Sequence, residues 1–327
     1  MQRREFIILA TATAATWSIV APAQQSRTRR VGILMSIQNS NDGQARVGAL
    51  RQALQQAGWF ESGNLHVDQR WGAGNDVRIQ VYASELVALD PDVIVVNDPR
   101  AMTAVQKVTQ NIPIVFIATL DPVGLQLVKS MERPGGNVTG FTTYHEAAIG
   151  RSLDTLLATV PRLKRVLALS HPDNASAPRY RKALDAATSG SRVTATAVDV
   201  RSAAQIESAV TAFAAEPDGG LLILPDGTTV AHRELLVGLA EKHRLPAIYG
   251  FRSFVTVGGL MSYGVDLLQL YRRAGSYVDR IFRGARAGDL PVQTPDKYEF
   301  LINRKTARTL GIDIPPAVLA RAEAVIE

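Results

Sequence analysis

Residues 92–118 read DVIVVNDPRAMTAVQKVTQNIPIVFIA, and this stretch decides the fold class. Two short apolar runs, Asp92 to Asn97 and Ile112 to Ala118, lie on either side of a predicted helix from Arg100 to Gln110. A strand that is apolar throughout is buried on both faces, which is typical of a parallel sheet covered by helices. The stretch therefore predicts a strand–helix–strand unit with a parallel connection.

The same alternation extends over most of the chain. Strands are predicted at residues 30–36, 65–71, 92–97, 112–118, 138–141, 165–170, 193–198, 220–224, 245–249 and 260–263. Helices are predicted at residues 42–57, 76–89, 100–110, 124–131, 146–159, 177–188, 202–215, 229–243 and 266–283. This number of strands is too large for one compact sheet. We therefore expect an α/β protein with two doubly wound parallel-sheet lobes.

The composition excludes several kinds of site. The 327 residues include no cysteine, which removes disulfides, thiolate metal sites, cysteine nucleophiles and a lipid anchor on cysteine. The 36 basic and 30 acidic residues give a net charge of +6 without a long basic block. Nucleic-acid binding needs clustered basic residues, so this charge favours solubility, and we expect no nucleic-acid partner.

The first 23 residues are typical of an export signal. Arg3 and Arg4 precede an apolar stretch from Phe6 to Val20, and Ala21-Pro22-Ala23 has the pattern of a signal-peptidase site. The apolar stretch is shorter than the roughly 20 residues of a membrane span, although a retained anchor is the alternative. Cleavage near Ala23 would release the protein into the periplasm. Both the Sec and the twin-arginine export routes remain open.

Polar groups follow five of the predicted strands, at residues 36–39, 97–99, 119–122, 170–174 and 225–228. Helix capping explains many of these residues individually. In open parallel sheets, however, ligands lie beyond the carboxyl ends of the strands. Helix N-termini there could hold an anionic group, and Asp98, Asp121, Asp226 and Asp266 could hold an ammonium group. A small zwitterion or polar organic molecule is the predicted ligand.

Motifs for catalysis and cofactor binding are missing from the sequence. It contains no dinucleotide fingerprint, P-loop or nucleophile elbow, and its histidines lack metal-ligand spacing. We therefore predict no catalytic residues, no cofactor and no metal. His171 is the histidine considered for ligand contact. Tyr144 and Phe251 could stack on a ligand ring, with core packing as the alternative.

From Arg30 to Glu327 the chain resembles ABC-transporter substrate-binding proteins of the type I periplasmic-binding-protein fold, some of which are described as tryptophan- or tyrosine-binding. The resemblance is carried by YASELVALDPDVIV (82–95), IPIVFIATLDPV (112–123), RPGGNVTG (133–140), RLPAIYGFR (244–252), GGLMSYGVD (258–266), and shorter matches to residue 316.

The resemblance implies three chain crossings between the lobes, which we expect near residues 137–140, 249–251 and 291–296. The first lobe would comprise residues 28–138 and 251–290, and the second residues 139–250 and 291–327. Glycines at two of these crossings suit a hinge.

The resemblance also implies a ligand site and a transport role. The implied ligand contacts are Ser36, Asn39, Asn97, Thr119, Asp121, Asp226 and Asp266. The protein would be a monomer that delivers its ligand to a membrane permease with a separate ATPase subunit. The alternative is a sensor that presents its closed form to a membrane receptor. An exported enzyme on this fold is a weaker third possibility.

Overall fold

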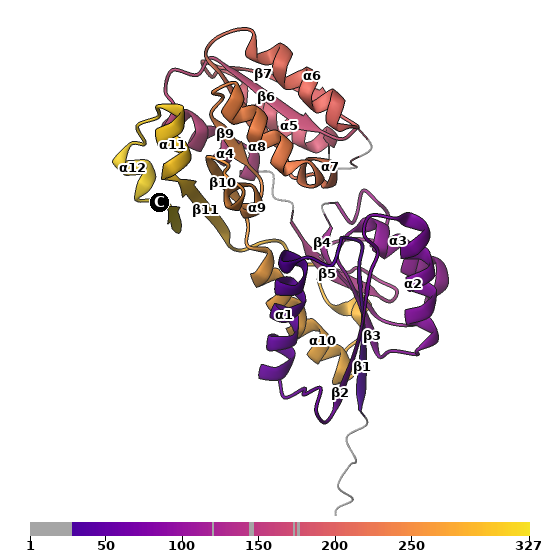
Figure 1. Cartoon of the computed structure of the whole chain (residues 1–327). Coiled ribbons are helices and arrows are strands. Elements are labelled where there is room, and N and C mark those ends of the chain that lie inside the picture. Colours follow the sequence, from indigo (N-terminus) through magenta and orange to yellow (C-terminus); the bar gives the residue numbers. More distant parts are fainter. Residues whose placement is uncertain (1–27, 120, 144–146, 173, 175–176) are drawn as a thin grey trace, which may run out of the picture.

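The computed structural model describes residues 28–327 except 120, 144–146, 173, 175 and 176. The predicted signal peptide and Tyr144 therefore lie outside the described residues. The chain forms two α/β lobes, one above the other in Figure 1. Within the described part, every helix is too short or too polar to cross a membrane.

The first lobe is built on a five-stranded parallel sheet in the order β2-β1-β3-β4-β5. Its strands are β1 (Arg29–Met35), β2 (Leu65–Trp71), β3 (Val93–Val96), β4 (Ile114–Thr119) and β5 (Val138–Thr142). Its helices are α1 (Asn41–Gln56), α2 (Asp76–Ala88), α3 (Pro99–Val108) and α10 (Leu267–Phe282), and a short 3-10 turn covers Ala287–Asp289. Side chains of α1 and α10 share one core with the sheet, and those of α2 and α3 share another. The helices therefore cover both faces of the sheet.

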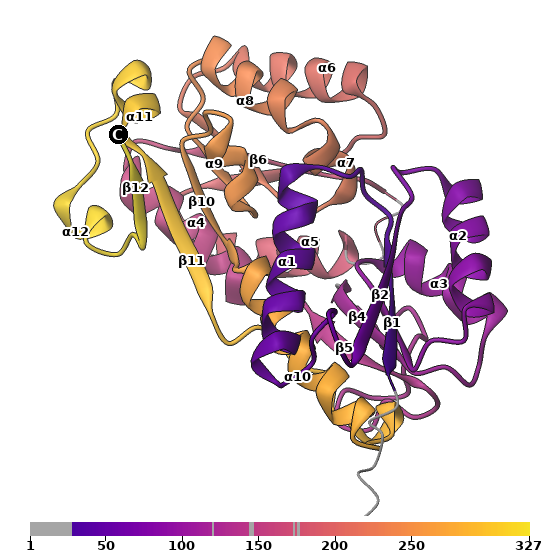
Figure 2. The same ribbon diagram turned by 60° about the horizontal axis from the view of Figure 1, so that its bottom comes forward.

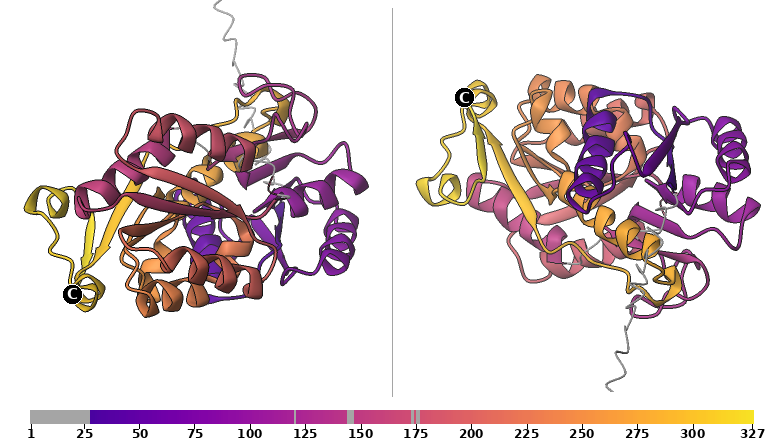
Figure 3. Two further views of the ribbon diagram at one scale, coloured as in Figure 1. Left: turned by 90° about the horizontal axis from the view of Figure 1, so that it is seen from above. Right: turned by 90° about the horizontal axis from the view of Figure 1, so that it is seen from below.

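The second lobe is built on a seven-stranded sheet in the order β12-β11-β10-β9-β8-β6-β7. Its strands are β6 (Arg165–Ser170), β7 (Thr194–Asp199), β8 (Gly219–Ile223), β9 (Ala247–Tyr249), β10 (Met261–Val265), β11 (Tyr298–Asn303) and β12 (Ala324–Ile326). Its helices are α4 (Ala147–Thr159), α5 (Ala177–Thr188), α6 (Ala203–Ala214), α7 (Gly227–Ala231), α8 (Arg233–Lys242), α9 (Arg252–Thr256), α11 (Arg304–Leu310) and α12 (Pro316–Leu319). Figure 3 shows α11, α12 and the C-terminus at the outer edge of this lobe.

Helix α10 packs beside α1 although more than 200 residues separate them, as Figure 2 shows. The close approach depends on Gly275, because a Cβ atom there would lie 2.5 Å from Cβ of Ala53. Tyr271, Ala274 and Val278 of α10 are buried in the same core. The first lobe is therefore completed by a helix that follows most of the second lobe in the chain.

The three crossings lie between β5 and α4, at Val265–Asp266, and over residues 291–297. The sequence placed the second crossing at 249–251, but β10 pairs with β9 and β11, so α9 and β10 belong to the second lobe. The first boundary at 138 is also shifted, because β5 pairs with β4. Gly250 does not lie at a crossing. It lies close to Gly264 of β10, where a Cβ atom on Gly264 would be 1.8 Å from the carbonyl oxygen of Gly250.

Two further expectations differ from the structure. Neighbouring strands pair in parallel except at one place, where β11 runs antiparallel to β10. The chain leaves the carboxyl end of β10 for the first lobe and returns at that same end, so β11 must run away from it. The predicted helix at 124–131 is a series of turns, in which Gln126 has a φ of +56°. A left-handed residue interrupts a right-handed helix.

We expect Gly275→Ala to lower the free energy of unfolding by about 1–3 kcal/mol, because its methyl group pushes α10 away from α1. Gly48→Ala in α1 is the matched control. A Cβ atom at Gly48 would meet nothing within 4 Å. That variant should therefore gain about 0.5–1 kcal/mol from helix propensity. Urea unfolding of both variants measures the difference, and equal stabilities would contradict the packing described for α10.

Candidate functional site

The carboxyl ends of the strands in both lobes carry the predicted polar residues. Figure 1 shows the end of β4 and the start of α7 on the sides where the lobes face each other. The polar residues therefore lie where the sequence placed them in the fold, but their individual partners differ from the expected roles.

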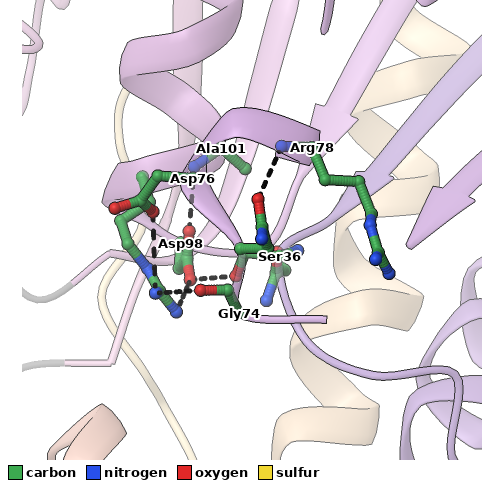
Figure 4. A network of polar contacts seen from close by, with 9 residues as sticks. Ser36, Gly74, Asp76, Arg78, Asp98 and Ala101 are labelled. Carbon is green, nitrogen blue, oxygen red and sulfur yellow. Dashed lines mark hydrogen bonds and ion pairs between the residues drawn. The ribbon is translucent and has the colours of Figure 1, made fainter. Parts of the chain in front are cut away.

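Ser36 and Asn97 come together in a buried network after β1 and β3, drawn in part in Figure 4. The backbone N–H of Ser36 donates to Oδ1 of Asn97 at 2.7 Å, and the Ser36 hydroxyl donates to Asp98. Asp98 also accepts from the Ala101 N–H at 3.0 Å and so caps α3. Arg100 lies near Asp98 and contacts the loop before α2. These side chains satisfy one another and hold the shape of this rim.

Asn39 lies on the same rim but is exposed. Its Oδ1 accepts from Nε2 of Gln44 at 2.6 Å, a contact within the start of α1. It therefore stands apart from the buried network of Ser36 and Asn97.

The end of β4 carries an unusual backbone. Ala118 has a φ of +64°, and the pairing of β4 with β5 shifts register between Ile117 and Thr119. A bulge of this kind turns the following side chains in new directions, and left-handed strain of this sort clusters at functional sites. Thr119 is fully buried, and its hydroxyl has no hydrogen-bond partner among the described residues.

Asp121 follows this bulge and is 6% exposed. Its Oδ1 accepts from the Gly124 N–H at 2.9 Å. Its Oδ2 lies 3.1 Å from Nε of Arg179, a residue of α5 in the other lobe. Both carboxylate oxygens are thus engaged, one by a local turn and one by the opposite lobe.

Asp226 and Asp266 act as helix caps. Asp226 accepts from the N–H groups of Thr228 and Thr229 at the start of α7, and from Nδ2 of Asn174 at 2.8 Å. The His171 backbone N–H donates to the same carboxylate at 3.3 Å, so the backbone of this histidine supports the rim. Asp266 accepts from the Gln269 N–H at 3.0 Å and begins α10 at the second crossing. The seven predicted contacts stay a prediction as ligand residues, and six of their side chains already have partners.

A small pocket, partly open to solvent, lies in the second lobe at the carboxyl ends of β8, β9 and β10. Its walls include the aromatic residues Tyr180, Tyr249, Phe251, Tyr263 and Tyr298. None of the seven predicted residues lines it. Phe251, considered from the sequence as a stacking residue, does.

Tyr263 and Tyr298 form a stacked pair with ring centroids 5.5 Å apart and an interplanar angle of 8°. Tyr263 packs against the core of the second lobe and Tyr298 against that of the first, so the pair lies between the two cores beside the crossings. Nη1 of Arg151 donates to the Tyr263 hydroxyl at 3.2 Å, which raises the pKa of Arg151. Burial, and then the neighbouring Tyr263, raise the pKa of the Tyr298 hydroxyl. At neutral pH the Tyr298 hydroxyl therefore keeps its proton, and Arg151 places a cation beside the ring pair.

The sequence offered weak signals for these residues. Tyr263 lies in the GGLMSYGVD segment and Tyr298 in a strand that the apolar pattern did not reveal. Arg179 and Tyr180 lie in α5. In the sequence, Arg179 looks like an ordinary surface position of a helix and Tyr180 like an ordinary core position.

Residues 30–326 match the family model described as ABC transporter substrate binding protein. The chain belongs to this family.

Three similar proteins illustrate the relationship. A tyrosine-binding protein of Clostridioides difficile (strain R20291) is 26% identical over 288 residues, which are 88% of this chain and 82% of that protein. The structure resembles an ABC domain from Streptococcus pneumonia in complex with L-Trp, with a TM-score of 0.83 at 25% identity, over 91% of this chain and 100% of that one. It also resembles a conserved domain protein from Vibrio cholerae, with a TM-score of 0.83 at 29% identity and the same coverage. The family consists of substrate-binding proteins and is typically extracytoplasmic.

We expect Asn97→Ala to lower the free energy of unfolding by about 1–3 kcal/mol, because it leaves the buried Ser36 N–H without a partner. Asn39→Ala, on the same rim, removes an exposed contact and should change stability by less than about 0.5 kcal/mol. Urea unfolding compares the two variants. Equal losses would show that the Asn97 contact does not organise the rim.

Proposed function

We propose that the protein is the periplasmic binding component of an ABC importer, and that it captures an aromatic amino acid or a related aromatic zwitterion. The pocket at the ends of β8–β10 is the observation that carries the choice of ligand. It places flat aromatic walls beside the chain crossings, where a bound molecule affects the relative position of the lobes.

The walls of this pocket suit an aromatic ring. Aromatic pairs gain roughly 0.5–1.5 kcal/mol beyond the burial of their area when they stack or meet edge to face. Tyr263 is half-buried and Phe251 is half-buried, so both rings keep some surface for a ligand. Arg151 brings a cation to the edge of Tyr263, which suits a carboxylate group on the ligand.

Two relatives support the same ligand class. One is named for binding tyrosine, and another was solved in complex with L-Trp. At about a quarter identity, these names guide the choice of compounds to test. Together with the pocket lining they favour an aromatic amino acid over a sugar or a nucleoside.

Capture works through the crossings between the lobes. An open form admits the ligand, and the ligand stabilises the closed form in proportion to its differential affinity for the two forms. The closed form then docks on a membrane permease, and a separate ATPase subunit drives release. The protein acts as a monomer that is exported through its N-terminal signal, with residues 1–23 removed.

A thermal-shift screen of the purified protein tests the proposed ligand class. The compounds are L-Trp, L-Tyr and L-Phe, with glucose, ribose and adenosine as the contrasting set. A ligand at 100 times its Kd adds about 2.7 kcal/mol to stability. We expect the melting temperature to rise by several degrees with an aromatic amino acid, and the compound to be recovered unchanged. A shift with glucose or adenosine alone would overturn the proposed ligand.

We expect Tyr263→Ala to weaken binding of the aromatic ligand by roughly tenfold, because it removes one stacking wall of the pocket. Tyr82→Ala is the control. Tyr82 is also half-buried, but it packs against the α2–α3 core of the first lobe, away from the pocket. Isothermal titration gives both Kd values. Equal affinities in wild type and Tyr263→Ala would place the ligand elsewhere.

A further inference from the structure

Asp121 and Arg179 form an ion pair that joins the two lobes. Asp121 follows β4 of the first lobe, and Arg179 belongs to α5 of the second. Oδ2 of Asp121 lies 3.1 Å from Nε of Arg179. The lobes have separate cores, so this contact exists only while their facing edges stay close together.

The carboxylate is held in place by its own lobe. Its Oδ1 accepts from the Gly124 N–H, and a Cβ atom at Gly124 would lie 2.1 Å from Oδ2. The bulge at Ala118 precedes it. The Asp121 side chain is 8% exposed, whereas that of Arg179 is 46% exposed. Because the acid is already ordered, the contact costs the conformational entropy of one long side chain, not two.

We infer that this pair is a latch that stabilises the closed arrangement of the lobes without touching the ligand. This inference rests on the proposed function, since it concerns closure of the same lobes. The latch raises the closed population in the free protein. Apparent ligand affinity rises with that population, because only the closed form makes the full set of contacts.

The same helix provides a matched control. Arg181 lies two residues after Arg179 in α5 and pairs with Asp199 of β7, within its own lobe. The substitutions Arg179→Gln and Arg181→Gln remove the same charge from the same helix. Only the first of them breaks a contact between the lobes.

The lack of cysteine in the chain makes the closure measurable. Thr103→Cys in α3 and Ser208→Cys in α6 place one spin label on an exposed helix of each lobe. Pulsed electron paramagnetic resonance then gives the distribution of interlobe distances in the ligand-free protein. We expect Arg179→Gln and Asp121→Asn each to lower the closed-to-open ratio about fivefold, the upper end for a partly exposed pair. Asparagine keeps the oxygen that accepts from Gly124.

The double variant Arg179→Gln with Asp121→Asn should show no further loss, because both changes remove one interaction. Arg181→Gln should match the wild type. Identical distributions in the wild type and both single variants would overturn the latch, as would an equal effect of Arg181→Gln. Ligand affinity is measured separately on the same samples. Closure that depends on Arg179 in a protein that binds none of the tested amino acids would count against the proposed ligand and not against the latch.

Discussion

The packing of α10 against α1 is the interaction on which the rest of the structure depends. The five-stranded sheet needs two helices on this face, and α10 comes from a part of the chain that follows β10 of the other lobe. The chain must therefore leave the second lobe after β10 and come back to it later. That requirement creates the second and third crossings, and it makes β11 antiparallel to β10. It also brings Tyr298, which opens β11, against the core of the first lobe.

The crossings are tied together by hydrogen bonds as well as by the chain. The Gln293 N–H donates to the Gly140 carbonyl, and the Thr142 N–H donates to the Gln293 carbonyl, each at 2.9 Å. Arg273 of α10 pairs with Asp296 at 2.9 Å. The first and third crossings are thus hydrogen-bonded to each other. The aromatic pocket lies next to these crossings, because Thr143 and Tyr298 line it.

The polar residues at the strand ends divide into two groups. Ser36, Asn97 and Asp226 satisfy neighbouring groups of their own lobe and maintain the rims. Asp121 also meets a residue of the opposite lobe. A buried carboxylate requires a partner, and here the partner is available when the lobes are close. Asp121, predicted from the sequence as a ligand contact, thus also joins the two lobes in this structure.

The sequence alone determined the order of most strands and helices up to α10, the two-lobed class and the family, because apolar runs and helix caps act over a few neighbouring residues. The strand at 92–97 and the cap at Asp98 are examples of such local information. Only the tertiary structure decided where the chain crosses, that β11 runs antiparallel, that Tyr263 stacks on Tyr298, and that Asp121 reaches Arg179. These features join residues far apart in the chain. Their contacts depend on how whole elements pack, and no local pattern of residue types encodes that packing.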